Sequence, residues 1–572
     1  MREKVKTEVL VVGGGIAGAF AAIRARELGA EVTLVDKATF GRSGCSTLAS
    51  GIYAAFMPGD DINAWLKDCV VDLTNPYMFD QIQSIEAIKK TYDLLQLMEK
   101  WGVKFVRAWG EIMRLMSSGG ELSRNVMLEE GGPQMMEALS AETKRLEVRV
   151  INRVMITDLL TSDGKHPTEG KVIGAIGFHT QNGCIVTFQA KATVLCAGPF
   201  SLIENMPRNV FGDGIAAAYR AGAVLCGLDK HGVMIVPEGL KSAPGIVMLL
   251  GMGAKLYNGK GERFMERYDP HLLEKTERNW LGLSAAREVR EGRGPILMDM
   301  THFTPDQFER IRMVIPIVIS NFEAAGFDIT KDRIPYVPEL RMTTVSGGGA
   351  RVDRDGSSSL KGLYAAGDSS DYARATTGSP LSSCAVTGYW AGEGAAHYAR
   401  EVSGTSLVDE QIENLEEQIR APLTQRDGVI FESLYEEIMQ IVNSHVGIFM
   451  HADALEKGVG KIDYINREKV GRLSAKEPHE LTKVHGLRNM AEVLELMMRA
   501  YLYRKESRGG FIREDFPLTD NINWLRWITM KRDGTSTIIS DEPIPVEDYP
   551  LKPVREKVSH PIFKDYQGTH GS

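Results

Sequence analysis

The chain contains 572 residues, more than one hydrophobic core usually organises, so two to four domains are expected. Its apolar content of 43% and charged content of 25% are typical of globular proteins. A net charge of −8 without a basic run argues against nucleic acid as a partner. No uncharged apolar stretch reaches the roughly 18 residues that a membrane span requires, so we expect membrane association only peripherally, through partner proteins.

The six cysteines are dispersed along the chain and form no CxxC pair. This spacing argues against a disulfide framework, a zinc site or an iron–sulfur cluster within the chain, and no metal site is predicted. The first apolar strand begins close to the N-terminus, so we expect no signal peptide, twin-arginine leader or transit sequence. The expected compartment is the cytoplasm, or the cytoplasmic face of a membrane.

Residues 11–18 read VVGGGIAG and end an apolar strand just before an apolar helix, which is expected over 19–29. Glycines allow a tight turn there, and backbone amides at the start of the helix can then face a pyrophosphate. The next strand, 31–36, ends in Asp36, 18 residues beyond Gly18. At this distance a carboxylate can accept hydrogen bonds from a ribose. The combination predicts a dinucleotide site, and an ordinary glycine-rich turn is the alternative.

Two later apolar strands also end in glycine. Residues 191–197 (KATVLCA) run into Gly198, and residues 362–368 read GLYAAGD. In this order the three segments resemble the flavoproteins of the two-dinucleotide-binding fold, in which the late Asp, here Asp368, hydrogen-bonds the ribityl and pyrophosphate part of FAD. The alternative for Asp368 is a helix cap after a buried strand. The resemblance implies that the cofactor is FAD.

Further segments narrow the resemblance. They are GDGIAAAYRAGA in 212–223, NGKGERFMERYDP in 258–270, REVREGRG in 287–294 and KESRGGFIREDFP in 505–517. With these segments the chain resembles the flavoprotein subunits of fumarate reductase and succinate dehydrogenase, from Thr7 to about residue 530. The resemblance implies an α/β fold, in which an FAD domain of the two-dinucleotide-binding type carries an inserted α+β capping domain and is followed by a C-terminal helical domain.

We place the FAD domain at 1–225 and 345–402, the capping domain at 226–344, the helical domain at 403–505 and a C-terminal segment at 506–572. In the helical domain, apolar side chains at three- and four-residue spacing predict a helix whose methionine-rich stripe is core rather than a ligand surface: Leu487, Met490, Val493, Leu494, Met497 and Met498. The last residues, 552–572, are polar and are expected to wrap a partner or to be disordered.

Many members of this family attach FAD covalently through a His in an R-S-H-T segment. Here residues 42–52 read RSGCSTLASGI, and Gly44 occupies the position of that His. Glycine has no nucleophile, so we predict that FAD is bound non-covalently, which favours reduction of the substrate over its oxidation. Cys45 is either a small buried residue beside the flavin or, as the alternative, a thioether link.

The motifs and the resemblance together assign a set of residues to FAD binding. They are Gly13, Gly15, Ile16, Ala17, Gly18, Asp36, Lys37, Ser43, Gly44, Cys45, Thr47, Ser50, Gly51, Ala197, Gly198, Asp213, Gly367, Asp368, Ser379, Leu381 and Ser382. No metal ligand set is predicted among them.

In the family, hydride passes between flavin N5 and one carbon of an activated C=C bond, while an arginine of the capping domain exchanges the proton at the other carbon. Arg278 stands in that register, twelve positions before Arg290. Because arginine is normally protonated, it acts as an acid only transiently, in a dry site. A structural ion pair with Glu274 or Glu277 is the alternative. His231 stands where a family His contacts a substrate carboxylate, and a structural His is the alternative there.

Several positions that hold a dicarboxylate in the family differ in this chain. They are Ile246 and Val247 in place of a Thr-Glu pair, Ala375 (beside Arg374) in place of an Arg, and the segment before Gly347, which lacks a His. Removing one partner of a buried charge costs about 2–5 kcal/mol. The combined losses argue against ordinary fumarate or succinate as the substrate. Glu238 is a candidate substitute for the missing Glu of the family's proton relay.

The sequence therefore predicts an FAD-dependent oxidoreductase subunit that acts on a small organic substrate, carboxylates included, other than plain fumarate. We expect an iron–sulfur protein subunit to exchange its electrons, because the chain has neither cluster ligands nor a second, NADH-type glycine motif. One alternative is an adenylylsulfate reductase-like flavoprotein subunit, which shares the run REGRGPILMD of 290–299. The other is a flavin-binding relay subunit with no substrate of its own.

Overall fold

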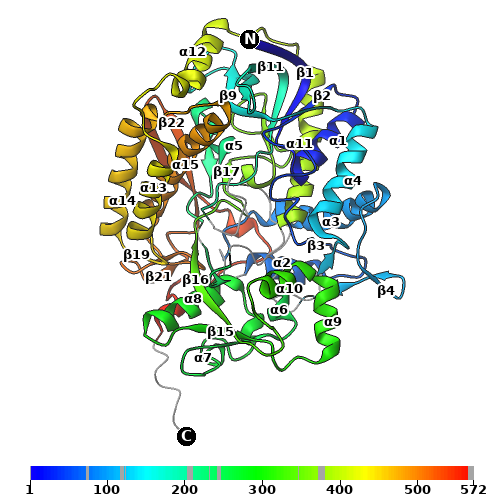
Figure 1. Ribbon diagram of the computed structural model, residues 1–572, viewed down its shortest axis with the longest axis vertical. Coiled ribbons are helices and arrows are strands. Elements are labelled where there is room, and N and C mark those ends of the chain that lie inside the picture. Colours follow the sequence, from blue (N-terminus) through cyan, green and yellow to red (C-terminus); the bar gives the residue numbers. More distant parts are fainter. Residues whose placement is uncertain are drawn as a thin grey trace.

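The computed structural model describes residues 2–71, 76–115, 122, 124–202, 210–230, 232–240, 246–345, 347–371 and 380–564 (Figure 1). Its largest sheet is built from β1 (Arg2–Val12), β2 (Val32–Asp36), β8 (Arg149–Asn152), β9 (Val154–Thr161), β10 (Val172–His179), β11 (Ile185–Leu195) and β18 (Leu363–Ala365). The strand order is β8-β2-β1-β11-β10-β9, with β18 also beside β11. Strands β8, β2, β1, β11 and β18 are parallel, β10 pairs antiparallel with β11, and β9 pairs antiparallel with β10.

Both faces of this sheet are buried. Val9 and Val11 of β1 pack in the cluster that contains α1 (Ile16–Glu27) and α11 (Pro380–Glu401), whereas Leu10 and Val12 pack in the cluster that contains α5 (Asp213–Ala221). Successive side chains of a strand point to opposite faces, so the last four residues of β1, Val9 to Val12, must all be apolar to serve both layers. The nearly continuous apolar sequence before Gly13 has this cause.

Helices α1 and α11 pack with their backbones close together. A Cβ added to Gly388 would lie 2.2 Å from the carbonyl oxygen of Ala17, and one added to Gly392 would lie 2.3 Å from that of Ala21. Helix α1 begins at Ile16 instead of residue 19. Its first turn is therefore part of the glycine-rich motif itself, and α11 holds that turn in place.

The layer around α1 is completed by α2 (Ile62–Val70), α3 (Gln81–Lys100) and α4 (Gly131–Arg145). Asp61 and Asp80 cap α2 and α3 by accepting hydrogen bonds from the amides of Asn63 and Gln83. Short strands lie between these helices: β3 (Ile52–Ala54), β6 (Arg114–Leu115) and β7 (Asn125–Met127) form one small sheet, and β4 (Arg107–Ala108) pairs with β5 (Glu111–Ile112).

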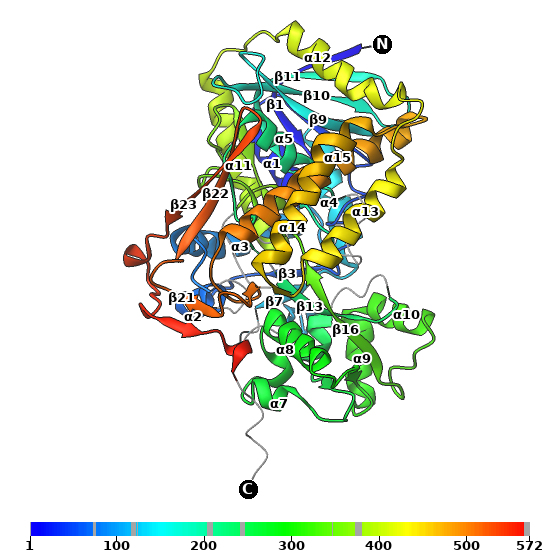
Figure 2. The same ribbon diagram turned by 90° about the vertical axis from the view of Figure 1, so that its left-hand side faces the viewer.

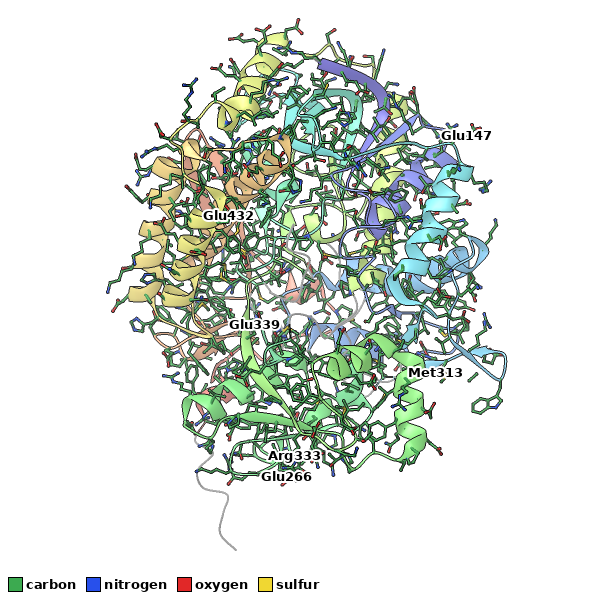
Figure 3. All side chains as sticks on the ribbon, in the orientation of Figure 1. Glu147, Glu266, Met313, Arg333, Glu339 and Glu432 are labelled. Carbon is green, nitrogen blue, oxygen red and sulfur yellow. The ribbon has the colours of Figure 1, made fainter. Side chains whose placement is uncertain are left out.

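Residues 232–341 build a second unit, at the bottom of Figures 1 and 2. Its four-stranded sheet has the order β13 (Gly232–Pro237), β16 (Ile334–Arg341), β15 (Ile296–Asp299), β14 (Lys255–Tyr257). Its helices are α6 (Ile246–Gly251), α7 (Met265–Tyr268), α8 (Arg278–Arg290), α9 (Pro305–Val314) and α10 (Pro316–Ala324). Arg333, at the lower edge of Figure 3, hydrogen-bonds Asp299 at 2.9 Å and lies 4.4 Å from the ring of Tyr257, which ties β15 to β14.

We call this second unit the cap. Its apolar core also contains Val106, Met127, Ile512 and Ile562, which come from other parts of the chain. The domain boundaries at 225 and 344 therefore stay predictions, because packing crosses them, and so do the boundaries at 402 and 505.

The helical part consists of α12 (Asp409–Arg420), α13 (Phe431–His445), α14 (Ala452–Tyr464) and α15 (Pro478–Tyr503). Figure 2 shows α13, α14 and α15 side by side. The predicted methionine-rich stripe of α15 is confirmed as core, because each of its six side chains is fully buried. None of the described helices is both long and apolar enough to cross a bilayer.

The C-terminal strands join distant parts of the chain. β22 (Arg526–Asp533) and β23 (Ser536–Pro543) form a sheet with β12 (Leu225–Cys226) and β17 (Gly349–Ala350), while β20 (Ile512–Arg513) pairs with β19 (Phe449–Met450) and β21 (Leu518–Asp520) with β24 (Lys557–Ser559). Arg287 of α8 donates hydrogen bonds to the carbonyls of Ile562 and Lys564. The expectation of disorder is thus wrong for residues 552–564, whereas contact with a partner stays a prediction, and residues 565–572 lie outside the described part.

Candidate functional site

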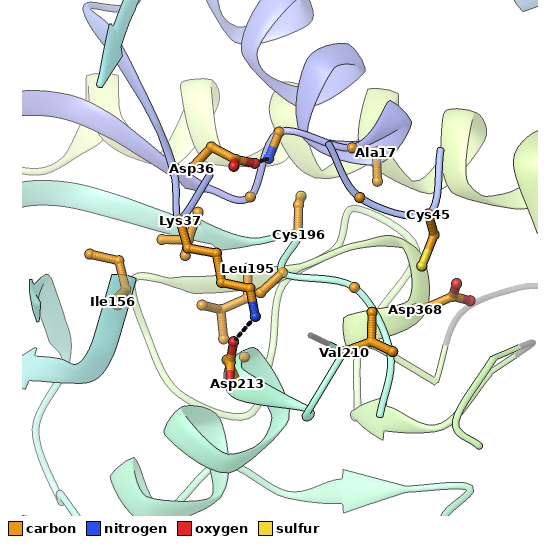
Figure 4. A pocket seen from close by; sticks show the side chains of 18 of the residues that line it. Ala17, Asp36, Lys37, Cys45, Ile156, Leu195, Cys196, Val210, Asp213 and Asp368 are labelled. Atoms are coloured by element: carbon orange, nitrogen blue, oxygen red, sulfur yellow. Dashed lines mark hydrogen bonds and ion pairs between the residues drawn. The ribbon is translucent and has the colours of Figure 1, made fainter. Parts of the chain in front are cut away.

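A cleft opens where β1, β2 and β11 end and where α1 and α5 begin (Figure 4). Parallel strands that end at one edge of a sheet leave such a crevice at their carboxyl ends. The wall is made by residues 12–17, 35–38, 43–46, 154–156 and 195–199, together with Val210, Asp213, Gly214, Ala217, Ala366, Asp368 and Cys384. The three motifs that the sequence analysis singled out therefore meet at one place.

The glycine turn forms the part of the wall suited to a pyrophosphate. Gly13 has a φ of +107°, and an added Cβ would lie 2.2 Å from the carbonyl oxygen of Cys196, so only glycine fits. The first turn of α1 follows directly, and its amides carry the positive end of the helix dipole. The amide of Ile16 donates to Ser46 Oγ at 3.0 Å, which fixes the loop after Ser43 against this turn. The residues present fit the phosphate groups of FAD.

Asp36 lies at the end of β2, on the cleft wall, where the sequence places it. Its Oδ2 accepts a hydrogen bond from the amide of Gly14 at 2.8 Å, and its Oδ1 accepts one from the amide of Ala38 at 2.7 Å. The carboxylate is thereby held between the glycine turn and the strand end. Each carboxylate oxygen can accept further hydrogen bonds, so Asp36 stays available to ribose hydroxyls.

A charged pair spans the same side of the cleft. Lys37 Nζ donates to Asp213 Oδ2 at 2.7 Å, and Figure 4 shows the two side chains meeting between the end of β2 and the start of α5. The other oxygen of Asp213 accepts a hydrogen bond from Asn489 of α15 at 2.9 Å. Both predicted residues therefore lie on the wall, and the helical part of the chain reaches one of them.

The opposite end of the cleft carries thiols in place of the family's His. Gly44 has a φ of +85°, and Cys45, Asp368 and Cys384 lie around it on the wall. Burial and then the Asp368 carboxylate raise the pKa of Cys45 to about 12, and burial raises the pKa of Cys384 as well. A thiolate is the nucleophilic form of cysteine, so the protonated state of Cys45 is consistent with a non-covalent flavin.

Most of the predicted FAD-binding residues line the cleft: Gly13, Gly15, Ile16, Ala17, Asp36, Lys37, Ser43, Gly44, Cys45, Ala197, Gly198, Asp213 and Asp368. The described wall does not include Gly18, Thr47, Ser50, Gly51, Gly367, Leu381 and Ser382. Gly18 and Gly367 allow close packing, since an added Cβ would lie 1.9 Å from the Gly13 oxygen or 2.9 Å from Ala17 Cβ. Ser379 lies outside the described residues. The contacts of all these residues with FAD stay a prediction.

Some residues of the cleft wall were not predicted, because no sequence motif marks them. Val154, Met155 and Ile156 come from the start of β9, and Val210 precedes the GDG segment. All four are buried apolar residues that motif reasoning cannot distinguish from core. Ser46 could have been suspected, because it stands within the loop that corresponds to the family's flavin-attachment segment.

Arg278 is the first residue of α8 in the cap, away from the described wall of the cleft. Its Nε lies 4.0 Å from Glu277 Oε1, and 21% of its side chain is exposed. Glu274, the other proposed partner, pairs instead with Arg263 at 2.6 Å. His231 lies outside the described residues.

The start of α8 is held rigidly. Glu277 caps the helix by accepting from the amides of Asn279 and Trp280, and Asn279 Oδ1 accepts from the amide of Val233 at 2.9 Å. Gly282 allows close contact with β13, because an added Cβ would lie 2.7 Å from the Val233 carbonyl carbon. Arg278 is therefore carried on a fixed helix end next to β13.

Among the positions that differ from the family's dicarboxylate clamp, Ile246 has a described side chain, and it lies in an apolar environment. Ile246 begins α6 and is buried, and Met248, Leu249 and Leu250 of the same helix are buried in the cap core. Glu238 follows β13 and is solvent-exposed, which argues against it as a buried proton relay. Residues 374 and 375 lie outside the described residues.

Residues of the motifs 258–270 and 287–294 form a hydrogen-bond network inside the cap. Glu288 is fully buried and accepts hydrogen bonds from Asn258, Arg267, Tyr268 and Arg293 at 2.7 to 3.2 Å. Burial alone would raise the pKa of Glu288, but these donors lower it overall, so the carboxylate stays charged. These motif residues hold β14, α7 and α8 together.

Comparison with known proteins gives the family. The FAD binding domain model matches residues 8–386, and the model for the C-terminal domain of fumarate reductase flavoproteins matches residues 435–558. One fumarate reductase (CoM/CoB) subunit, from Methanothermobacter marburgensis, is 30% identical over 560 residues, which cover 93% of this chain and 98% of that one. The chain belongs to the fumarate reductase and succinate dehydrogenase flavoprotein family. It is an FAD-dependent oxidoreductase, and its cofactor is FAD.

Other relatives agree with this assignment. The succinate dehydrogenase flavoprotein subunit of Rickettsia conorii is 25% identical over 578 residues, or 94% of each chain. Among solved structures, a quinol fumarate reductase chain of E. coli superposes with a TM-score of 0.84 at 22% identity, covering 96% of this chain and 98% of that one. An adenylylsulfate reductase of Archaeoglobus fulgidus superposes with a TM-score of 0.80 at 18% identity, covering 95% and 96%. These structures confirm the predicted fold class.

Proposed function

We propose that this flavoprotein transfers hydride between FAD and an activated C=C bond of an organic substrate other than fumarate. Helix α6 is the observation that carries the proposal, because Ile246, Met248, Leu249 and Leu250 are apolar and buried, and Ile246 stands where the family has the first residue of a polar Thr-Glu pair. A carboxylate held there without donors would lose several kcal/mol of binding free energy. The chain therefore favours a substrate with a less charged end.

Bound FAD supplies the hydride chemistry. The residues of the chain that would hold it are the first turn of α1 for its phosphates, Asp36 for its ribose hydroxyls, and the Lys37–Asp213 pair on the same wall. Arg278 exchanges the proton at the second carbon through its guanidinium group, whose Nε lies 4.0 Å from Glu277 Oε1. Cys45 remains a thiol and makes no bond to the flavin.

We propose an iron–sulfur protein as the electron partner. Two relatives are named as subunits, which supports assembly with other chains. Within the described part of the chain, no group of three or more His, Cys, Asp or Glu side chains could hold a metal. The expected place of the complex is the cytoplasm or, through partner subunits, the cytoplasmic face of a membrane.

The test uses the purified protein with its FAD chemically reduced under anaerobic conditions. Reoxidation is followed from the flavin absorbance after addition of fumarate, unsaturated monocarboxylic acids or their thioesters. We expect one of the less charged acceptors to reoxidise the flavin, and fumarate to fail. Fumarate acting as the fastest acceptor would contradict the proposed specificity.

The same assay separates the two alternatives. Reduction of the oxidised flavin by sulfite with AMP would favour an adenylylsulfate reductase-like subunit. Reoxidation by an iron–sulfur protein but by no organic acceptor would favour a relay subunit. Acid precipitation tests the attachment, because non-covalent FAD must appear in the supernatant, and a yellow pellet would contradict that part.

A further inference from the structure

Asn489 of α15 connects the cofactor cleft to a buried arginine. Its side-chain Nδ2 donates to Asp213 Oδ1 at 2.9 Å, and its Oδ1 accepts from Arg220 Nη1 at 3.0 Å. Asn489 is only 2% exposed and stands behind the described wall of the cleft, where Asp213 lies. It belongs to the helical part of the chain, more than 250 residues beyond Asp213 and Arg220.

Arg220 fixes the orientation of this amide. The guanidinium donates to Asp158 Oδ1 at 2.6 Å, to the Thr157 carbonyl at 2.7 Å and to Glu492 Oε2 at 2.5 Å. Burial opposes its charge, but the two carboxylates raise the pKa of Arg220 overall, so it remains a donor. Because Arg220 can only donate, the oxygen of Asn489 must face it, and the NH₂ group must face Asp213.

Both oxygens of Asp213 are thus assigned. Oδ1 receives the amide of Asn489, and Oδ2 receives the ammonium of Lys37 at 2.7 Å. Because its two oxygens accept hydrogen bonds from two directions, the Asp213 side chain keeps one rotamer. A carboxylate that is already oriented loses less conformational entropy when a ligand binds to it. The carboxylate is therefore presented to the cleft in a fixed position.

We propose that Asn489 is a positioning residue for FAD: it holds the Asp213 carboxylate against the cofactor and so slows release of FAD. The inference rests on the proposed contact between Asp213 and FAD. It follows that the helical part of the chain, which makes no wall of the described cleft, contributes to cofactor retention.

The decisive variant is Asn489→Asp in the full-length holoprotein. Aspartate has the same size and still accepts from Arg220, but it replaces the donor that faces Asp213 with a second carboxylate oxygen. We expect FAD to dissociate about tenfold faster, measured as the recovery of free-flavin fluorescence after dilution. A role confined to holding Arg220 would leave the release rate unchanged, and that result would overturn the proposal.

A second variant and a control variant distinguish a specific effect on FAD release from a general loss of stability. Asn489→Ala introduces no charge and should also accelerate release, by a smaller factor; an unchanged rate contradicts the proposal. Asn466→Asp is the matched control, since Asn466 also hydrogen-bonds α15, through the Ala491 carbonyl and Glu495, but away from the cleft. It should leave the rate of FAD release as in the wild type, and acceleration by this variant would assign the effect to α15 stability instead.

The variant Asp213→Asn tests the contact between Asp213 and FAD separately from the role of Asn489. If Asp213→Asn leaves FAD release unchanged, the proposed contact between Asp213 and FAD is wrong, and the inference is wrong with it. If Asp213→Asn accelerates release and Asn489→Asp does not, only the role of Asn489 is refuted. In the double variant, the effects should be non-additive, because the two side chains act through one contact.

Discussion

Gly13 combines two requirements that a single residue type meets. Its φ of +107° lies in the left-handed region, and the Cys196 carbonyl occupies the place of its missing side chain, 2.2 Å from an added Cβ. Its amide donates to the carbonyl of Val35 at 2.8 Å, which ties the turn to the end of β2. The turn between β1 and α1 therefore depends on this glycine for both shape and packing.

Replacing Gly13 by alanine should abolish FAD binding. The collision with the β11 backbone has no flexible partner that could yield, so the cost should exceed about 3 kcal/mol. The purified protein should be colourless, with a lower melting temperature. Gly29→Ala is the control: its φ is +89°, and no described atom lies within 4 Å of the added Cβ. It carries only the backbone strain of about 1–2 kcal/mol and should stay yellow.

Arg278 is the residue on which the proposed proton transfer depends. Arg278→Lys keeps a positive charge but shortens and reshapes the donor, so turnover should fall by about 10²-fold or more. FAD content should be unchanged, because Arg278 is outside the described cleft wall. Full activity in Arg278→Lys, with the substrate identified by the reoxidation assay, would show that another group supplies the proton.

At the scale of elements, hydrogen bonds from other parts of the chain fix α15 at its C-terminal end and in its middle. Its C-terminal carbonyls are satisfied by Arg513, whose Nη1 donates to the oxygens of Tyr501 at 2.7 Å and Arg504 at 2.9 Å. In its middle, His485 is 3% exposed and hydrogen-bonds the Ile419 carbonyl at 3.0 Å, which requires a protonated Nε2. Burial lowers the pKa of His485 to about 4, so the ring is neutral in the folded protein at neutral pH.

This burial makes α15 acid-sensitive. Below pH 6.5 the unfolded chain binds a proton at His485 that the folded chain binds only near pH 4, so the free energy of unfolding falls between these values. The loss should reach on the order of 3 kcal/mol. In His485→Gln, urea denaturation at pH 7 and pH 5 should show a smaller loss. His479→Gln, exposed on the same helix, should keep the wild-type dependence; an equal slope in His485→Gln would contradict the assignment.

At the scale of the whole molecule, the ESRG motif and the C-terminus link the cap to the rest. Buried Glu506 binds Arg504 and Arg508, and Arg504 binds Asp229 at 2.6 Å, just before β13 enters the cap. On the other side, residues 560–564 lie against α8. Trp280 packs against His560 with 6.2 Å between ring centroids. The cap is therefore attached at both its chain connection and its helix α8.

Removing residues 557–572 should loosen the cap without releasing FAD. The truncation takes Ile562 from the cap core and the two carbonyl acceptors from Arg287. Limited proteolysis within 232–341 should become about tenfold faster, because local opening costs less free energy. Removing only 565–572 leaves every described contact intact and serves as the control. Equal cleavage rates for both truncations would refute the role of the segment.

Much of the cofactor cleft could be predicted from the sequence, because each of its motifs lies within a short segment of the chain. The glycine turn, the acid at the end of β2 and the GDG and GLYAAGD segments each follow from the backbone geometry of one strand end, so Gly13, Asp36, Asp213 and Asp368 were found. Ile156 and Val210 were missed, because an apolar wall residue has the same pattern as a core residue. His231 and Ser379 lie outside the described residues and stay predictions.

The chain alone determined the family, the fold class and the cofactor, since these depend on residue types at short spacing. Only the folded structure could show that motifs such as Glu288 and Glu506 hold the cap together, that the tail to residue 564 binds α8, and that Asn489 reaches Asp213. The physical reason is distance along the chain: contacts between residues hundreds of positions apart leave no periodicity in the sequence.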